Sequence, residues 1–297
     1  MSAWNIIESS VTPDLSALVA LARELGSRAE PTPIVPIALA TVLGIDTRGV
    51  AVALFCGPTS FVPVRASRDG GGWRLSGSAG AVPWGEDATT LLIAAVTDEA
   101  APSSVHSLGL FIVDTDRPGV VRSPRSSIGA PSMAHVRLDD VHVSGAARYG
   151  AASGAGGAPW SSVVPALDKA TIVTAAELAG VARGALDAAV AYATRREQFG
   201  APIATYQALA HRLADMAIDT DSAELAVEEA LDAPTAQNAS RAKIIANDAA
   251  HRVTAGLHQI NGGVGFYADQ TPPAFYARAL ALRFEMGDSA IHRTRLA

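Results

Sequence analysis

The longest run of uninterrupted helix signal constrains the fold of this chain most. Residues 167–196 contain no proline, and Gly180 and Gly184 are the only glycines that weaken the pattern. At about 1.5 Å per residue, a helix over this stretch is about 45 Å long. We therefore expect the C-terminal part of the chain to be helical.

Further helices are expected beyond this one. Apolar residues recur at helical spacing from a start at Pro202. A helix over residues 239–259 is expected to end at Asn261, because the two glycines that follow are a strong C-cap signal. Helix signals resume over residues 273–284. A last short helix follows, with Asp288 as its N-cap.

The first half of the chain carries different signals. Residues 14–43 predict two short helices, the first of them capped by Asp14. Between residues 46 and 148, short β-branched and aromatic runs alternate with turn residues, which predicts an antiparallel sandwich or barrel. The expected strands cover residues 50–55, 61–64, 73–75, 90–96, 109–113 and 136–143.

These changes of pattern divide the chain into three expected domains. Residues 1–45 form a reduced N-terminal helical segment, residues 46–150 a middle β domain and residues 151–297 a C-terminal helical-bundle domain. Residues 150–157 are almost entirely glycine and alanine, which is typical of a linker or flexible loop.

Composition excludes several classes of protein. A hydrophobic content of 49% excludes disorder, and a net charge of −6 argues against a nucleic-acid surface. No stretch approaches about 18 consecutive apolar residues, so no membrane span is expected. The residues after Met1 lack a signal-peptide pattern, and Cys56 as the one cysteine fits a reducing compartment. We therefore expect a cytoplasmic protein.

Several common catalytic motifs are missing from the sequence. There is no HExxH, no cysteine pair, no GxSxG and no P-loop. His251 and His258 stand two turns apart on a predicted helix, and structural or surface histidines are the favoured interpretation over a metal site. The run Gly262-Gly263-Val264-Gly265 follows a helix and lacks the GxGxxG spacing, which rejects a dinucleotide-binding fingerprint.

Two polar, glycine-containing segments remain as candidate sites. Residues 195–207 place arginines, amides and aromatics at the junction of two long helices, and an arginine fork matches two oxygens of a pyrophosphate. Residues 259–266 contain glycines that allow a ligand to approach the backbone closely. Taken singly, each segment is also explained by local structure. The first is then a polar turn between helices with Phe199 in the core, and the second a helix C-cap.

Together these two segments resemble the acyl-CoA dehydrogenase family. The C-terminal domain of that family carries R-x-Q-F-G-x-P-I-x-x-[FY]-Q, then Q-x-x-G-G-x-G-[FY], and finally I-[QH]-R. This chain has the matching residues in the same order: Arg196, Gln198, Phe199, Gly200, Pro202, Ile203, Tyr206, Gln207, Gln259, Gly262, Gly263, Gly265, Phe266, Ile291, His292 and Arg293. The resemblance is strong over residues 165–297, moderate over 46–148 and weak before residue 46.

The resemblance implies an α+β fold with truncated N-terminal helices, a middle antiparallel β domain and a C-terminal four-helix bundle. It also implies an FAD cofactor, whose adenine and pyrophosphate half these segments reach in a neighbouring subunit. The residues to which this cofactor-binding role carries over are Arg196, Gln198, Phe199, Gln207, Gln259, Gly262 and Gly263. An acyl-CoA substrate is implied as well.

The chain also departs from the family pattern. The N-terminal helical domain is mostly missing, and residues 56–61 stand where the family has a T-E-P-x-x-G-S-D-like flavin loop but carry no carboxylate. Pro83, near the usual flavin-edge strand, removes a backbone donor. The family's reaction needs a carboxylate base, yet Met286 and Ala170 occupy the two places where the family carries it. No catalytic residue is therefore assigned.

Three interpretations follow from these departures. The first is a subunit of a heteromeric acyl-CoA dehydrogenase, which shares FAD with a second, catalytic subunit, as do actinobacterial heterotetramers that act on steroid-derived CoA thioesters. The second is a self-sufficient homo-oligomer whose base is Glu285, although Glu285 is otherwise read as a solvated carboxylate near a helix end. The third is a non-catalytic assembly or CoA-ester-binding protein.

Overall fold

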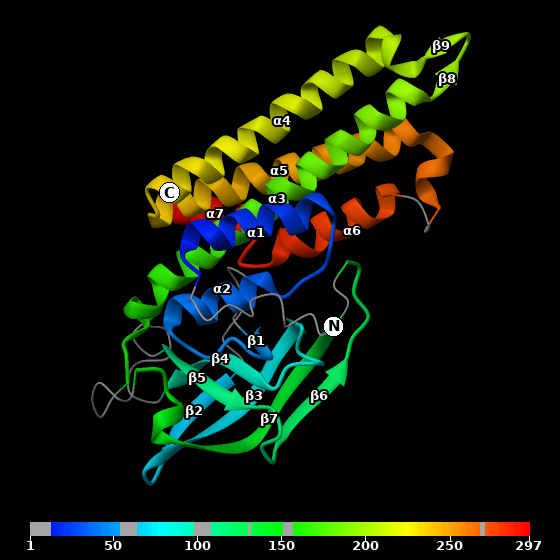
Figure 1. The fold of residues 1–297 in the computed structure, drawn as a ribbon. Helices are drawn as coiled ribbons and strands as arrows, with labels where there is room; N and C mark the ends of the chain where they lie inside the picture. Colours follow the sequence, from blue (N-terminus) through cyan, green and yellow to red (C-terminus); the bar gives the residue numbers. More distant parts are fainter. Residues whose placement is uncertain (1–12, 54–63, 98–107, 130–131, 151–156, 268–270) are drawn as a thin grey trace. The chain divides into compact units, whose positions relative to one another are not determined.

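The computed structural model describes the whole chain except residues 1–12, 54–63, 98–107, 130–131, 151–156 and 268–270. The described chain forms two compact units (Figure 1). A sheet unit spans Val35–Leu167, and a helical unit combines Val11–Ile34 with Asp168–Ala297. Among the described helices, none is both long and apolar enough to cross a membrane.

The sheet unit is built on one seven-stranded sheet. Its strands are β1 (Val50–Ala53), β2 (Val64–Asp69), β3 (Gly72–Pro83), β4 (Thr90–Thr97), β5 (Leu108–Asp114), β6 (Val120–Pro124) and β7 (Met133–Ser144). The order is β1-β4-β2-β3-β7-β6, with β5 on β4. Most pairs are antiparallel as expected, but β1 and β2 both run parallel to β4. Parallel neighbours need a long connection, and here β2 and β3 lie between β1 and β4 in the chain.

Several strands differ from the expected ones: β3 runs on to Pro83 where only residues 73–75 were expected, and β2 continues to Asp69. The predicted strand over residues 50–55 is described only to Ala53, and the one over 61–64 lies outside the described residues apart from Val64. The sequence also missed β6. Its residues are mostly exposed, so the sequence shows no alternation of buried apolar side chains that would predict a strand. The strand is defined by its pairing with β7.

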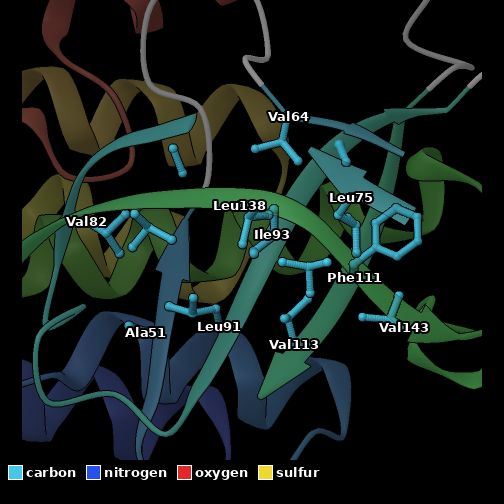
Figure 2. Close-up of a cluster of buried hydrophobic side chains, with 14 of the residues drawn as sticks. Ala51, Val64, Leu75, Val82, Leu91, Ile93, Phe111, Val113, Leu138 and Val143 are labelled. Carbon is cyan, nitrogen blue, oxygen red and sulfur yellow. The ribbon is translucent and has the colours of Figure 1, made fainter. Parts of the chain in front are cut away.

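Large apolar side chains fill the inner face of the sheet (Figure 2). Trp73 and Phe111 are almost completely buried and meet edge to face, with ring centroids 5.5 Å apart. The strand β7 shows the alternation that builds this core, because Val136 and Leu138 are buried while Arg137 between them is exposed. Helix α2 (Ile34–Leu43) belongs mainly to this unit.

The helical unit contains the expected bundle. Its helices are α1 (Leu15–Ser27), most of α3 (Trp160–Arg195), α4 (Gln207–Asp232), α5 (Ala236–Asn261), α6 (Thr271–Phe284) and α7 (Ser289–Leu296). Of these, α3, α4 and α5 are the longest, with 36, 26 and 26 residues, and α6 has 14. Both predicted N-caps are confirmed. Asp14 accepts from the amide of Ala17 at 2.8 Å, and Asp288 from that of Ile291 at 2.9 Å.

Two helix starts differ clearly from the expected ones: α3 begins at Trp160 rather than near Leu167 and contains Pro165, and α4 begins at Gln207 rather than at Pro202. Pro202 does not begin this helix but lies in a two-residue strand, β9 (Ala201–Pro202), which pairs with β8 (Glu197–Gln198). The turn between them requires positive φ angles at Phe199 (53°) and Gly200 (83°). A short 3₁₀ turn, Ile203–Thr205, then leads into α4 at Gln207.

Helices α1 and α3 approach each other closely through glycines. A Cβ atom on Gly180 would lie 2.2 Å from the carbonyl oxygen of Arg23, and one on Gly184 would lie 2.1 Å from that of Ser27. On the other helix, a Cβ on Gly26 would lie 2.1 Å from the carbonyl oxygen of Glu177. The two glycines that look like weak points of α3 are therefore what allows α1 to pack on it.

Candidate functional site

The two candidate segments lie at the same end of the bundle. Successive helices run in opposite directions, so the end of α3, the start of α4 and the end of α5 meet there, beside the β8–β9 hairpin (Figure 1). Arg196 follows α3, Gln207 is the first residue of α4, and Gln259 lies in the last turn of α5. The chain then continues into a 3₁₀ turn, η6 (Gly262–Phe266). The fold thus gathers all seven predicted residues on one part of the helical unit.

The β8–β9 hairpin is fixed on the start of α4. Tyr206 donates its hydroxyl hydrogen to the carbonyl of Gln198 at 2.6 Å, and the Ile203 amide donates to the carbonyl of Arg196 at 2.8 Å. Phe199 meets the ring of Tyr206 edge to face, at 6.3 Å between centroids, yet remains 95% exposed. The prediction of a core position for Phe199 is therefore wrong within this chain. The tight turn carries its ring away from the bundle.

Polar side chains around this hairpin face outward. Arg196, Gln198, Gln207 and Gln259 are all exposed. A guanidinium and several amides are donors suited to phosphate oxygens. Because these groups face outward, a ligand held by them needs a second surface to enclose it.

The turn η6 exposes backbone rather than side chains. Gly262 has a φ of 61° and caps α5 by donating its amide to the carbonyl of His258, so the predicted C-cap is confirmed. Within the described chain, a Cβ on Gly262 or Gly263 would have nothing within 4 Å. The backbone of both glycines is therefore open to a ligand. Residues 259–266 can therefore serve both as the C-cap of α5 and as a site where a ligand approaches the backbone.

The two positions that the resemblance assigns to the base are Ala170 and Met286, and the structure describes both. Ala170 is fully buried in α3, and Met286 stands in the turn between α6 and α7 with a φ of 58°. His292 holds this turn, since its Nε2 donates to the Met286 carbonyl at 3.0 Å while Nδ1 lies 3.2 Å from the Ser240 hydroxyl. Burial lowers the pKa of His292 to about 4, so the ring is neutral.

Glu285 belongs to a buried group of charges, so its interpretation as a solvated carboxylate is wrong. It is partly buried, and this burial raises its pKa although the positive charges of Arg278 and Lys243 oppose the rise. The Lys243 ammonium donates to the carbonyls of Leu282 and Arg283 at 3.1 and 3.2 Å, and it thereby caps the end of α6.

The centre of this group is the ion pair between Glu177 and Arg278. Both side chains are almost fully buried, and Nε of Arg278 donates to Oε1 of Glu177 at 2.7 Å. Burial raises the pKa of Glu177 to about 7, against the opposing charge of Arg278 and with a further contribution from Glu285. The sequence analysis missed this pair, although a glutamate among the alanines and leucines of α3 was the available signal.

No group of three or more His, Cys, Asp or Glu side chains is placed to hold a metal ion among the described residues. Residues 56–61, which the resemblance aligns with the flavin loop of the family, lie outside the described part of the chain. Pro83 ends β3, and the buried Trp84 follows it with a φ of 64°.

The chain combines a mixed sheet in one unit with a helical bundle and an open glycine turn in the other, an α+β fold that matches the acyl-CoA dehydrogenase architecture. Comparison with known proteins then supports a specific family. Residues 157–297 match the C-terminal domain of acyl-CoA dehydrogenases. The mitochondrial short-chain specific acyl-CoA dehydrogenase of Bos taurus is 31% identical over 238 residues, which cover 77% of this chain and 56% of that protein. These matches support a place for the chain in the acyl-CoA dehydrogenase family.

Two solved complexes share the fold over almost the whole chain. The ChsE4–ChsE5 complex of Mycobacterium tuberculosis has 26% identity and a TM-score of 0.83, over 95% of this chain and 79% of the matched one. A steroid acyl-CoA dehydrogenase variant, Tcur3481–Tcur3483, has 28% identity and a TM-score of 0.81, over 95% and 80%. By contrast, the chain spans only 56% of the length of the bovine relative.

Proposed function

We propose that this chain is one subunit of a flavin-dependent acyl-CoA dehydrogenase, and that it lends the adenine-side half of an FAD site to a second, catalytic subunit. One observation carries the proposal. The seven candidate residues gather at one end of the bundle with their polar groups facing outward, while the turn that carries the base in the family holds Met286. Such a surface completes a site on a neighbour.

The donor set at this end fits the pyrophosphate and adenine of FAD. Arg196 offers a fork of N–H donors to two phosphate oxygens, and Gln198, Gln207 and Gln259 offer amides. The exposed ring of Phe199 offers a face for stacking, and the open backbone at Gly262 and Gly263 allows close approach. When bound, FAD supplies the hydride acceptor for α,β-dehydrogenation of a CoA thioester. This chain's own residues bind and orient the cofactor.

The partner and the substrate class are part of the same proposal. Both solved complexes described above pair two differently named chains, and one of them is a steroid acyl-CoA dehydrogenase. This similarity supports a second acyl-CoA dehydrogenase-like subunit as the partner and a steroid-derived CoA thioester as the substrate. The two remaining interpretations, a homo-oligomer that uses Glu285 and a non-catalytic CoA-ester-binding protein, predict different flavin contents.

Flavin content of the purified protein tests the proposal. We expect the chain alone to bind little FAD and to be poorly soluble, because half of a cofactor site leaves apolar rings such as Phe199 and Phe266 exposed. With the product of the neighbouring gene, it should hold about one FAD per heterodimer, as read from visible absorbance. A yellow, active homo-oligomer with one FAD per chain would overturn the proposal. A complex with no flavin would favour the non-catalytic interpretation.

We expect Arg196→Ala and Gln259→Ala to weaken FAD binding by the assembled complex by roughly ten- to a hundredfold each, because a hydrogen bond to a charged group contributes about 1.5–3 kcal/mol. The measurement is FAD affinity from flavin fluorescence. Matched controls are Arg241→Ala and Gln237→Ala, which remove the same exposed groups near the start of α5, at the other end of that helix. Equal FAD affinity in all four variants would remove the basis for the adenine-side site.

The role of Glu285 separates the first interpretation from the second. We expect Glu285→Gln to leave kcat of the assembled enzyme within a few-fold, because this carboxylate lies with Arg278 and Lys243 rather than at the place of the base. Loss of a true general base typically lowers the rate by about 10²–10⁴-fold. A fall of that size, with FAD bound and the complex intact, would make Glu285 the base and favour a self-sufficient enzyme.

A further inference from the structure

Four aromatic rings form a continuous row along the end of the helical unit that carries the candidate site. His251 and His258 lie two turns apart on α5, and Tyr276 of α6 contacts both, with ring centroids 6.2 and 5.4 Å away. His258 also contacts Phe266 of η6, with centroids 5.4 Å apart and ring planes inclined by 38°. His258 is therefore the ring that links the glycine turn to both α5 and α6.

His258 is joined to the candidate site through the backbone as well. It immediately precedes Gln259, and its carbonyl accepts the amide hydrogen of Gly262. Among the described residues, the Tyr267 amide also donates to the Val264 carbonyl, and Gly265 lies close to Asn261. Phe266 is 77% exposed, and the ring that it contacts among the described aromatic pairs is that of His258.

The contact is one of ring packing rather than of hydrogen bonding. Nδ1 of His258 is buried, and it has no hydrogen-bond partner among the described residues. A buried polar atom without a partner is unfavourable, whereas a ring of similar shape without that atom keeps the packing. We therefore expect His258→Phe to keep the ring packing and His258→Ala to remove it.

We propose that His258 is a positioning residue, whose ring holds η6 against α5 and α6 and thereby sets the backbone of Gly262 and Gly263 for the pyrophosphate of FAD. This inference rests on the proposed function for its ligand, but its structural half stands on the ring contacts alone. His258 does not touch the cofactor. It acts through the turn that does.

Two readouts on three variants test this inference. The variants are His258→Ala, His258→Phe and the matched control His251→Ala, which removes a ring from the same row that does not contact Phe266. The first readout is hydrogen exchange of the peptide that covers residues 257–267, in FAD-free protein. The second is FAD affinity of the assembled complex. We expect His258→Ala to speed exchange in this peptide about three- to tenfold and to weaken FAD binding several-fold, while the other two variants remain close to the original protein.

The outcomes separate this inference from the proposed function. Unchanged exchange in His258→Ala overturns the positioning role. An equal loss of FAD affinity in His258→Phe and His258→Ala overturns it as well. An equal effect of His251→Ala also overturns it, because the link to Phe266 would then not be what matters. If His258→Ala speeds exchange but leaves FAD affinity unchanged, His258 does stabilise η6, but FAD does not bind at this turn.

Discussion

Arg278→Met is expected to destabilise the helical unit by about 3–5 kcal/mol, because it leaves the buried Glu177 carboxylate without its partner. For a unit of this size, the loss corresponds to a fall of roughly 10 °C in the thermal unfolding midpoint of the assembled complex. The replacement keeps a long apolar side chain, so the cavity contribution is small. What is lost is the charge and its hydrogen bonds.

The pH dependence of this loss identifies its cause. Arg278 holds down the pKa of Glu177, which burial raises to about 7 even in its presence, so removing Arg278 raises the pKa further. A folded-state pKa above the unfolded value means that the folded state binds the proton more tightly. Stability is then lost as the pH rises through the folded-state pKa. The loss of unfolding free energy in Arg278→Met should therefore be larger at pH 8.5 than at pH 6.

The double variant provides the control. Removing Glu177 as well, as Arg278→Met with Glu177→Gln, eliminates the uncompensated charge, so much of the lost stability should return and the pH dependence should disappear. If the double variant melted as low as Arg278→Met at both pH values, packing around Arg278 would be responsible rather than the ion pair.

Local signals in the sequence predicted most of the helical part of the fold. Asp14 and Asp288 mark helix starts because a side-chain oxygen satisfies an amide in the first turn, and Gly262 marks a helix end because it tolerates a positive φ. These are properties of a few neighbouring residues. They are readable without knowledge of the rest of the molecule.

Features that depend on distant residues were not predictable in the same way. Strand β6 is defined by its pairing with β7, and the parallel pairing of β1 with β4 by a connection that contains two other strands. Glu177 and Arg278 are 101 residues apart, so neither residue alone indicates an ion pair. Pro202 was misread because proline suits both the first turn of a helix and a short edge strand.

The candidate site lies between these cases. Its residues came from a resemblance to a family, while their meeting at one end of the bundle follows from the alternating direction of α3, α4 and α5. The exposure of the five side chains of the set could not be predicted from the sequence. For Phe199, the positive φ angles of the turn formed with Gly200 accompany the exposure of its ring.

For Gly180 and Gly184 of α3, helix propensity and the packing against α1 predict opposite changes in stability on substitution by alanine. Helix propensity alone predicts that Gly180→Ala and Gly184→Ala stabilise the protein by about 1 kcal/mol each. In the structure, the new Cβ atoms would lie 2.2 and 2.1 Å from carbonyl oxygens of α1, and backbone cannot move aside as a flexible side chain can. We therefore expect each variant to lose about 1–3 kcal/mol through displacement of α1.

Gly256→Ala in α5 is the matched control for this prediction. Its Cβ would lie 2.7 Å from the sulfur of Met216, which is the far end of a flexible side chain that can rotate away. This variant should therefore melt close to the original protein or slightly above it. If Gly180→Ala and Gly184→Ala behaved like Gly256→Ala in thermal unfolding of the assembled complex, α1 would not be held against α3 as the structure shows. The two glycines would then be no more than weak points of a long helix.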